Sequence, residues 1–306
     1  MAKKRKPLGK LVPIKLGKRA ILRAYGIKSF SALKIWEGPS AFDGEPIMVL
    51  LSNYATNTGN EKIGKEFAQV WILPMPKKNY LGKLVDILPR EAYEKKSPTV
   101  CGTCSHLGQG CYVVWSRLKS LYDCGKVQKP LLDRYGGRAL LRKLIAGQYI
   151  RLGAAGDPLA MPLEIAKLLT DGSKRFTGYT HAWYNLDIDQ LDEWRGLVMA
   201  SVDSEKEREA AKYLGWRTFR TIKGDLVLGD KEIQCLADSP AKKSCATCGL
   251  CNGKADPRIK KDIAINVHGL NLYRYKIDDY ETSDKFASVR MLVDFWKSRS
   301  NQSPDC

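Results

Sequence analysis

The sequence predicts an α/β fold built on a parallel sheet, with a partial or complete TIM-like barrel as the first choice of arrangement. From residue 148 onward, short apolar runs alternate with segments of helical periodicity, which is typical of strands joined by helical crossovers. Polar residues gather after several of these runs, where a parallel barrel places its active site. A doubly wound sheet is the alternative.

The 306 residues divide into three expected regions. Residues 1–20 predict a basic flexible arm, because prolines and glycines interrupt any helix there. Residues 21–98 predict a small β-containing N-terminal extension, in which residues 46–51 and 67–73 form an antiparallel strand pair. Residues 99–306 predict the barrel-like domain, with metal-binding cysteine loops.

The elements follow in order along the chain. Residues 19–35 predict a short helix or strand pair, and residues 74–98 a linker or surface loop. The strands expected in the barrel-like domain are residues 148–153, 176–181, 197–201, 216–220, 233–236 and 262–266. The helices expected there are residues 112–118, 138–146, 160–170, 187–194, 205–214 and 282–298.

The formal charge of +18 is concentrated at the N-terminus. Residues 1–40 hold eleven Lys or Arg against one acid, Glu37. Such a field favours nucleic acid as the partner, through neutralisation of phosphates. A solvated tail that keeps the protein in solution is the alternative. The expected phosphate contacts of the arm are Lys3, Lys4, Arg5, Lys6 and Lys10.

The chain has no run of about 18 apolar residues, so no membrane span is expected. Its basic start is not followed by an apolar segment, so no secretory signal is expected either. Nine cysteines in such a chain indicate a reducing compartment, the cytoplasm, and metal ligation in preference to disulfides.

Seven of the nine cysteines fall into two groups. The first group is Cys101, Cys104 and Cys111, and the second is Cys235, Cys245, Cys248 and Cys251. Four thiolates can close a metal site completely, whereas three leave one iron of a 4Fe–4S cluster open for a substrate or S-adenosylmethionine. His106 or Cys124 could complete the first group. Zinc is the alternative metal, although the compressed spacing of the second group favours iron–sulfur.

Polar side chains at the expected strand ends are candidates for the chemistry. Asp157, His181 and Asp203 would orient a substrate or move protons. Either aspartate could instead cap the helix that follows it, and His181 could simply be packed against its neighbours. The candidate cofactor-binding residues are Arg151, Gly153, Gly156, Thr180 and Ser201. Arg220 and His268 are expected at the same strand ends.

Several motifs together resemble an uncharacterised family carried by bacteriophages and mobile elements. They lie between about residues 36 and 268 and are Cys101-Gly-Thr-Cys104, Gly156-Asp157-Pro158, Thr177-Gly-Tyr-Thr-His181, Ala200-Ser-Val-Asp-Ser204 and Cys245-Ala-Thr-Cys248-Gly-Leu-Cys251. More loosely, Gly110-Cys111-Tyr112 with the Gly-Asp and Ser-Val-Asp steps is similar to phage proteins of the radical S-adenosylmethionine superfamily. That superfamily's usual motif is C-x3-C-x2-C, whereas this chain has C-x2-C-x6-C.

The second resemblance implies a partial TIM barrel with a catalytic cluster on the first cysteine group and an auxiliary cluster on the second. Three hypotheses for the function follow. One is an iron–sulfur enzyme of radical type that modifies a nucleic acid or a nucleotide precursor. Another is a zinc-stabilised barrel that exchanges or cleaves a base, with Asp157 or Asp203 as nucleophile or base. The third is a non-enzymatic nucleic-acid-binding phage protein with structural metal sites.

Overall fold

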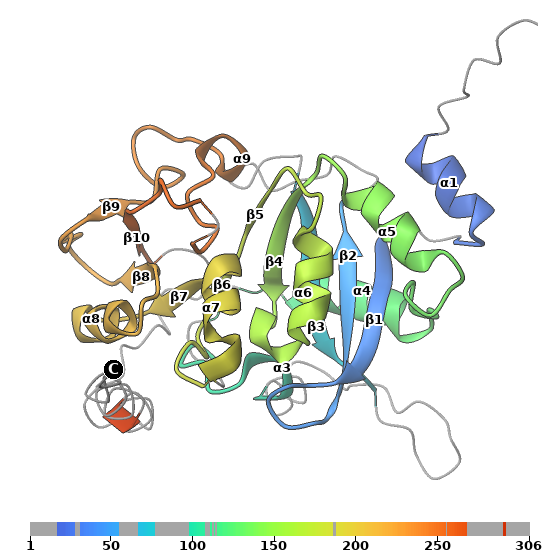
Figure 1. Ribbon diagram of the computed structural model, residues 1–306, viewed down its shortest axis with the longest axis horizontal. Coiled ribbons are helices and arrows are strands. Elements are labelled where there is room, and N and C mark those ends of the chain that lie inside the picture. The colour runs from blue at the N-terminus through green and yellow to red at the C-terminus, as the bar shows by residue number, and fades with distance from the viewer. Residues whose placement is uncertain are drawn as a thin grey trace, which may run out of the picture.

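The computed structural model of the chain describes residues 17–27, 31–54, 67–76, 98–107, 111, 113, 115–185, 188–254, 256–267 and 290–291. These residues form two five-stranded sheets covered by helices (Figure 1). The strand order is β1-β2-β3-β4-β5 in the first sheet and β6-β7-β8-β10-β9 in the second. The predicted α/β class is therefore confirmed. The pairing within the described part of the chain does not show a closed barrel.

The strands are β1 (Ala32–Pro39), β2 (Pro46–Ser52), β3 (Phe67–Pro74), β4 (Tyr149–Ala155), β5 (Arg175–Thr177), β6 (Tyr179–Thr180), β7 (Met199–Val202), β8 (Thr218–Ile222), β9 (Glu232–Gln234) and β10 (Asp262–Asn266). The helices are α1 (Lys18–Ala24), α3 (Pro98–Cys101), α4 (Trp115–Lys126), α5 (Gly137–Ile145), the 3-10 helix η1 (Pro158–Ala160), α6 (Leu163–Thr170), α7 (Ile188–Leu197), α8 (Glu205–Tyr213) and α9 (Cys245–Cys248).

The pairing changes direction once along the first sheet. Strands β1, β2 and β3 are antiparallel, which confirms the predicted pair at residues 46–51 and 67–73. Strand β3 then pairs in parallel with β4, so strands on both sides of residue 98 share one sheet. Every later pairing is parallel, and each strand predicted after residue 148 is present.

The predicted strand at residues 176–181 is divided into β5 and β6 by Gly178. The Gly178 N–H donates to the carbonyl of Cys251 at 3.2 Å, and its carbonyl accepts from Met199 at 3.0 Å. A Cβ atom on this residue would lie 2.7 Å from Cγ1 of Val198. The chain therefore passes from one sheet to the other at a position that has no room for a side chain.

Apolar residues cover both faces of the first sheet. In β2, Ile47, Val49 and Leu51 belong to the core that includes α5 and α6, whereas Met48 and Leu50 pack toward α4. This alternation follows from the period of two in a strand. Because both faces are covered, the strand reads as a continuous apolar run in the sequence. Helix α8 packs against β7 and β8 of the second sheet (Figure 1).

Some sequence predictions lie outside the described residues. These are the arm residues Lys3, Lys4, Arg5, Lys6 and Lys10, together with His268 and most of residues 74–98 and 282–298. The expected arm boundary at residue 20 falls inside α1, whose Leu22 is fully buried. Lys18 Nζ of the same helix donates to the carbonyls of Tyr54 and Leu144, at 3.2 and 3.1 Å. None of the described helices is long and apolar enough to span a membrane.

Candidate functional site

Three parallel strands and the first cysteine loop meet at one edge of the sheets. Asp157 lies two residues beyond β4, His181 directly follows β6, and Asp203 directly follows β7. Residues 101–107 approach the same edge, where the Asp157 N–H donates to the carbonyl of Val100 at 2.6 Å. The carboxyl ends of parallel strands share one edge, so residues distant in the sequence come together there.

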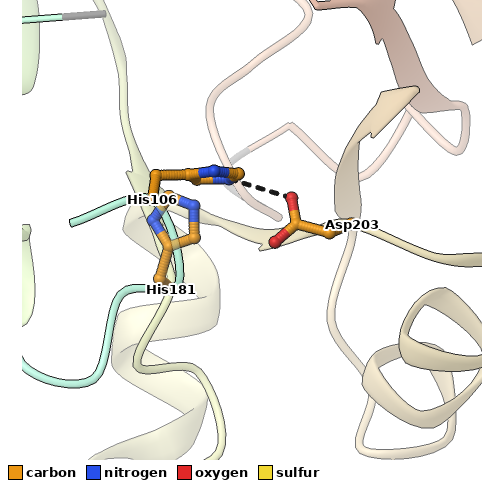
Figure 2. Close-up of side chains that lie close together, drawn as sticks. All are labelled: His106, His181 and Asp203. Atoms are coloured by element: carbon orange, nitrogen blue, oxygen red, sulfur yellow. Dashed lines mark hydrogen bonds and ion pairs between the residues drawn. The ribbon is translucent and has the colours of Figure 1, made fainter. Parts of the chain in front are cut away.

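His106, His181 and Asp203 form the centre of this site (Figure 2). His106 Nε2 and Asp203 Oδ1 are 3.0 Å apart. The rings of His106 and His181 meet edge to face, with centroids 5.0 Å apart. The ligand atoms of the three side chains all lie within 4.8 Å of one another. A carboxylate and two imidazoles at this spacing can exchange protons or share a cation.

Asp203 is held by the cysteine loop and does not cap α8. Ser105 donates to Oδ2 of Asp203 at 2.8 Å, which directs Oδ1 toward His106. Ser204 is the N-cap of α8, and its hydroxyl accepts from the Glu207 N–H at 3.1 Å. The Glu207 carboxylate in turn accepts from the Asp203 N–H at 2.8 Å. The Asp203 carboxylate is therefore directed at the loop and the two histidines.

Asp157 is a buried carboxylate that both caps a helix and fixes its neighbours. Oδ1 accepts from the Leu159 N–H at 3.0 Å, which caps η1. Oδ2 accepts from the Thr180 hydroxyl at 3.0 Å and from the His181 N–H at 2.8 Å. Burial raises the pKa of Asp157 to about 6, although these hydrogen bonds act in the opposite direction. Asp157 therefore holds the backbone on which the His181 side chain is mounted.

The thiols of the first cysteine group lie beside these carboxylates. Burial raises the pKa of Cys101 and of Cys104, and the neighbouring Cys111 and Asp157 raise both further. Asp203 also raises the pKa of Cys104. A bound cation would reverse this penalty, because it stabilises thiolates. The donor set therefore fits a metal or an iron–sulfur cluster held by three cysteines.

Gly156 supports this loop through its backbone. Its backbone hydrogen-bonds the Cys101 thiol and holds down the pKa of that thiol. Its φ is +78°, and a Cβ atom there would lie 2.4 Å from the carbonyl oxygen of Ile72. Cys124, a candidate fourth ligand, lies elsewhere: its sulfur is on α4, 2.9 Å from Gln128 Nε2 and 3.6 Å from the carbonyl of Ala32.

The four thiols of the second cysteine group also lie close together. Cys235 follows β9, Cys245 and Cys248 are on α9, and Cys251 comes three residues later. Burial raises the pKa of Cys245 to about 11 and that of Cys251 to about 12, and the neighbouring Cys235 and Cys248 add to both shifts. Four converging thiols fit a closed structural metal site, with either zinc or a cluster.

Arg217 hydrogen-bonds the backbone around the second cysteine group. Arg217 as a whole residue is 7% exposed. It donates to three backbone carbonyls, those of Leu250 at 2.9 Å, Gly253 at 2.7 Å and Lys261. Burial lowers the pKa of Arg217, and the nearby Cys251 partly offsets this. The arginine thus neutralises part of the charge that a thiolate would carry there.

Two predicted strand-end arginines lie away from the central site. Arg151 is the third residue of β4, which runs on to Ala155, and its charge acts on Cys245 of the second group. Arg220 points to the α8 side of β8, where it bonds Glu232 and lies 3.2 Å from Glu205. The prediction that both arginines lie at the carboxyl ends of their strands was wrong. The strands run on beyond them, and the face of the sheet decides where each side chain points.

The remaining predicted cofactor-binding residues are buried or tightly packed around the site. Thr180 is fully buried on Asp157, and the carbonyl of Ser201 accepts from Trp183 Nε1 at 3.2 Å. Gly153 has φ +66° where β4 bulges against β3. Their observed roles are structural, and no ligand contact is needed to explain them.

Sequence reasoning missed two polar contacts that position the cysteine loop. Ser105 bonds Asp203, and the Thr103 hydroxyl bonds that of Tyr184, close after His181. His106 was expected only as a fourth ligand of the thiols, whereas it contacts Asp203. The only signal in the sequence was the position of these residues between Cys101 and Cys111.

Comparisons with known proteins give no relative for this chain. No protein-family model matches it, and searches of curated proteins and of solved structures find no similar protein. The resemblances to a phage family and to the radical S-adenosylmethionine superfamily therefore remain predictions, and the function is argued from the site.

Proposed function

We propose that the protein is an iron–sulfur enzyme that modifies a nucleic acid or a nucleotide precursor at the carboxyl edge of its parallel strands. One observation supports this most directly. The thiols of the first cysteine group share a buried site with Asp157 and Asp203, beside His106 and His181. A purely structural metal loop would not need ionisable side chains from three separate strand ends around it.

The strand order favours a partial barrel over a doubly wound sheet. Strands β3, β4 and β5 are neighbours in chain order, and after Gly178 the order continues through β6, β7, β8 and β10. A doubly wound sheet reverses its strand order at a switch point, whereas a barrel adds each parallel strand beside the last. We propose that β3 to β10 form the wall of a partial barrel, with the first cysteine loop after its first parallel strand.

Each group of residues has a role in this proposal. Cys101, Cys104 and Cys111 would hold a 4Fe–4S cluster. When bound by three thiolates, such a cluster supplies one-electron chemistry and one open iron position, for a substrate or S-adenosylmethionine. Asp203 and His106 are placed to hold or move a proton between carboxylate and imidazole. The second cysteine group would hold an auxiliary site, and a reducing cytoplasm would keep all these thiols available.

A metal assay on three proteins tests the cluster. Wild type, a Cys101→Ser/Cys104→Ser/Cys111→Ser variant and a Cys245→Ser/Cys248→Ser/Cys251→Ser variant are purified without oxygen, and iron, sulfide and zinc are counted per chain. We expect brown wild-type protein with sulfide equal to iron, and loss of a full cluster in the first variant. Colourless wild-type protein that carries zinc and no iron would refute the proposal.

The nucleic-acid part of the proposal rests on the net charge of +18. Deletion of residues 1–16 removes six Lys or Arg and spares α1, whose Leu22 is buried. If the arm contacts phosphates, the slope of log affinity against log salt should fall by as much as about 5. A full-length variant with Lys3, Lys4, Arg5, Lys6 and Lys10 changed to Gln controls for chain length. An unchanged slope in both would remove the arm from the proposal.

A further inference from the structure

We propose that His106, His181 and Asp203 bind one divalent transition-metal ion at a site separate from the thiols of the first cysteine group. The three side chains come from the cysteine loop, the end of β6 and the end of β7 (Figure 2). This site goes beyond the iron–sulfur proposal, and it stands even if the thiols hold no cluster. With an ion bound, His106 Nε2 and Asp203 Oδ1 would ligate the metal instead of sharing a proton.

The spacing of the three ligand atoms fits a single ion. Metal–nitrogen and metal–oxygen bonds are about 2.0–2.2 Å, so two ligands at a right angle lie about 3 Å apart and two opposed ligands about 4.2 Å. His106 Nε2 and Asp203 Oδ1 are 3.0 Å apart, and all three ligand atoms fall within 4.8 Å of one another. Small rotations of the side chains would therefore complete the coordination.

The neighbours of this trio hold the ligands in position, as the outer partners of metal sites do. Ser105 fixes one oxygen of Asp203, which leaves the other for the metal. Asp157 accepts from the His181 N–H and from Thr180, and so fixes the turn that carries the His181 ring. These hydrogen bonds therefore hold Asp203 and His181, two of the three proposed ligands, in position.

The donor set limits the kind of ion. Two imidazoles and one carboxylate suit iron(II), cobalt(II), zinc(II) or manganese(II), and they leave coordination positions open for water or a substrate. Calcium and magnesium prefer oxygen ligands alone. The side chains of His106 and Asp203 are 12% and 6% exposed, so an ion here would lie in a largely enclosed site.

Cobalt(II) distinguishes this site from the thiols by its spectrum. Cobalt bound to thiolate shows a sulfur-to-metal charge-transfer band in the near ultraviolet, whereas cobalt bound to nitrogen and oxygen shows only weak visible bands. Cobalt is titrated without oxygen into the full-length Cys101→Ser/Cys104→Ser/Cys111→Ser variant, first alone and then with His106→Ala, Asp203→Asn or Ser105→Ala added. Asp192→Asn, which changes an exposed carboxylate on α7, is the matched control.

Cobalt taken up by the four thiols of the second cysteine group would show the charge-transfer band. We expect the cysteine variant to bind one further cobalt whose binding adds no such band, and the Asp192→Asn control to bind it equally. Loss of His106 or of the Asp203 carboxylate should weaken binding at least about 100-fold, and Ser105→Ala, which keeps all three ligands, about 10-fold. No such binding in a folded cysteine variant, or equal binding when His106 and Asp203 are changed, would overturn the inference. The trio would then be a hydrogen-bonded proton-transfer group. The iron and sulfide counts described above do not bear on this result.

Discussion

The two cysteine groups lie at opposite ends of the same parallel strands. The first begins at Cys101, the last residue of α3, where the carbonyl of Val100 accepts from the Asp157 N–H beyond the end of β4. The second includes α9, where Cys245 and Ala246 pack against Phe67 and Tyr149, the first residues of β3 and β4. Figure 1 shows α3 and α9 at opposite ends of β4. The chain thus has two groups of cysteines in two different surroundings.

The neighbours of each group determine which chemistry a metal bound there could support. The first group lies among carboxylates and near imidazoles, which can bind a substrate or move protons. The second lies among a buried arginine, backbone carbonyls and aromatic rings. In open parallel sheets, ligands bind beyond the carboxyl ends of the strands. The difference teaches that the identity of the ligands alone does not reveal the role of a metal site.

The largest effect should come from removing thiols of the second cysteine group, if they hold the proposed metal. A Cys245→Ser/Cys248→Ser variant should lose the cooperative unfolding of the second sheet, because structural metal binding contributes on the order of 10 kcal/mol to folding in small zinc domains. Calorimetry and a metal count measure this. Cys101→Ser/Cys104→Ser should cost less, since Ser105 and Asp157 still anchor that loop. Equal losses of stability in the two double variants would contradict the proposed difference between the two cysteine groups. As a control, Cys124→Ser should leave the metal content unchanged.

A smaller effect should follow from Arg217→Ala. This change removes a buried cation from three carbonyls and should destabilise the protein by roughly 3 kcal/mol or more, with weaker metal retention at the second group alone. Denaturant unfolding and metal counts test this. The Arg258 side chain is 88% exposed, so Arg258→Ala should leave the denaturant midpoint of unfolding unchanged. Normal stability of Arg217→Ala would show that the arginine does not support the second site.

The smallest effect concerns Asp157 at the first site. The folded pKa of about 6, against an ordinary 3.8, means that the metal-free folded chain holds a proton that the unfolded chain releases between these pH values. Stability therefore falls by up to about 3 kcal/mol as pH rises from about 4 to 6. The free energy of unfolding, measured with denaturant at several pH values in this range, should fall more steeply with rising pH for wild type than for Asp157→Asn. Parallel curves would contradict the raised pKa.

Local patterns were enough to predict most of the sheet. The six strands after residue 148 and the pair at 46–51 and 67–73 are present because apolar runs of this length, bounded by glycine and proline, leave little alternative. Strand β1 was less clear: residues 19–35 were expected to hold a helix or a strand pair, and they hold α1 and the start of β1. The division at Gly178 was missed, because only the packing of Val198 shows that a side chain is excluded there.

The centre of the site was only partly predictable. The positions of Asp157, His181 and Asp203 at one edge were predictable, because parallel strands bring their carboxyl ends together, whereas their catalytic role stays a prediction. The contact of His106 with Asp203 joins residues 97 positions apart, and no local pattern carries such a contact. Arg151 and Arg220 were misplaced for a related reason, since neither the end of a strand nor the face of a side chain is fixed by composition.

The link between Gly178 and Cys251 has a consequence for the order of assembly during synthesis. Strands β1 to β5 have left the ribosome well before the second cysteine group is made, and they can pair as soon as they emerge. The hydrogen bond from the Gly178 N–H to the carbonyl of Cys251 can form only after Cys251 has been synthesised. The nascent protein should therefore pass through a stage with one finished sheet and one unfinished sheet, and the metal proposed for the second cysteine group would be bound only after that stage.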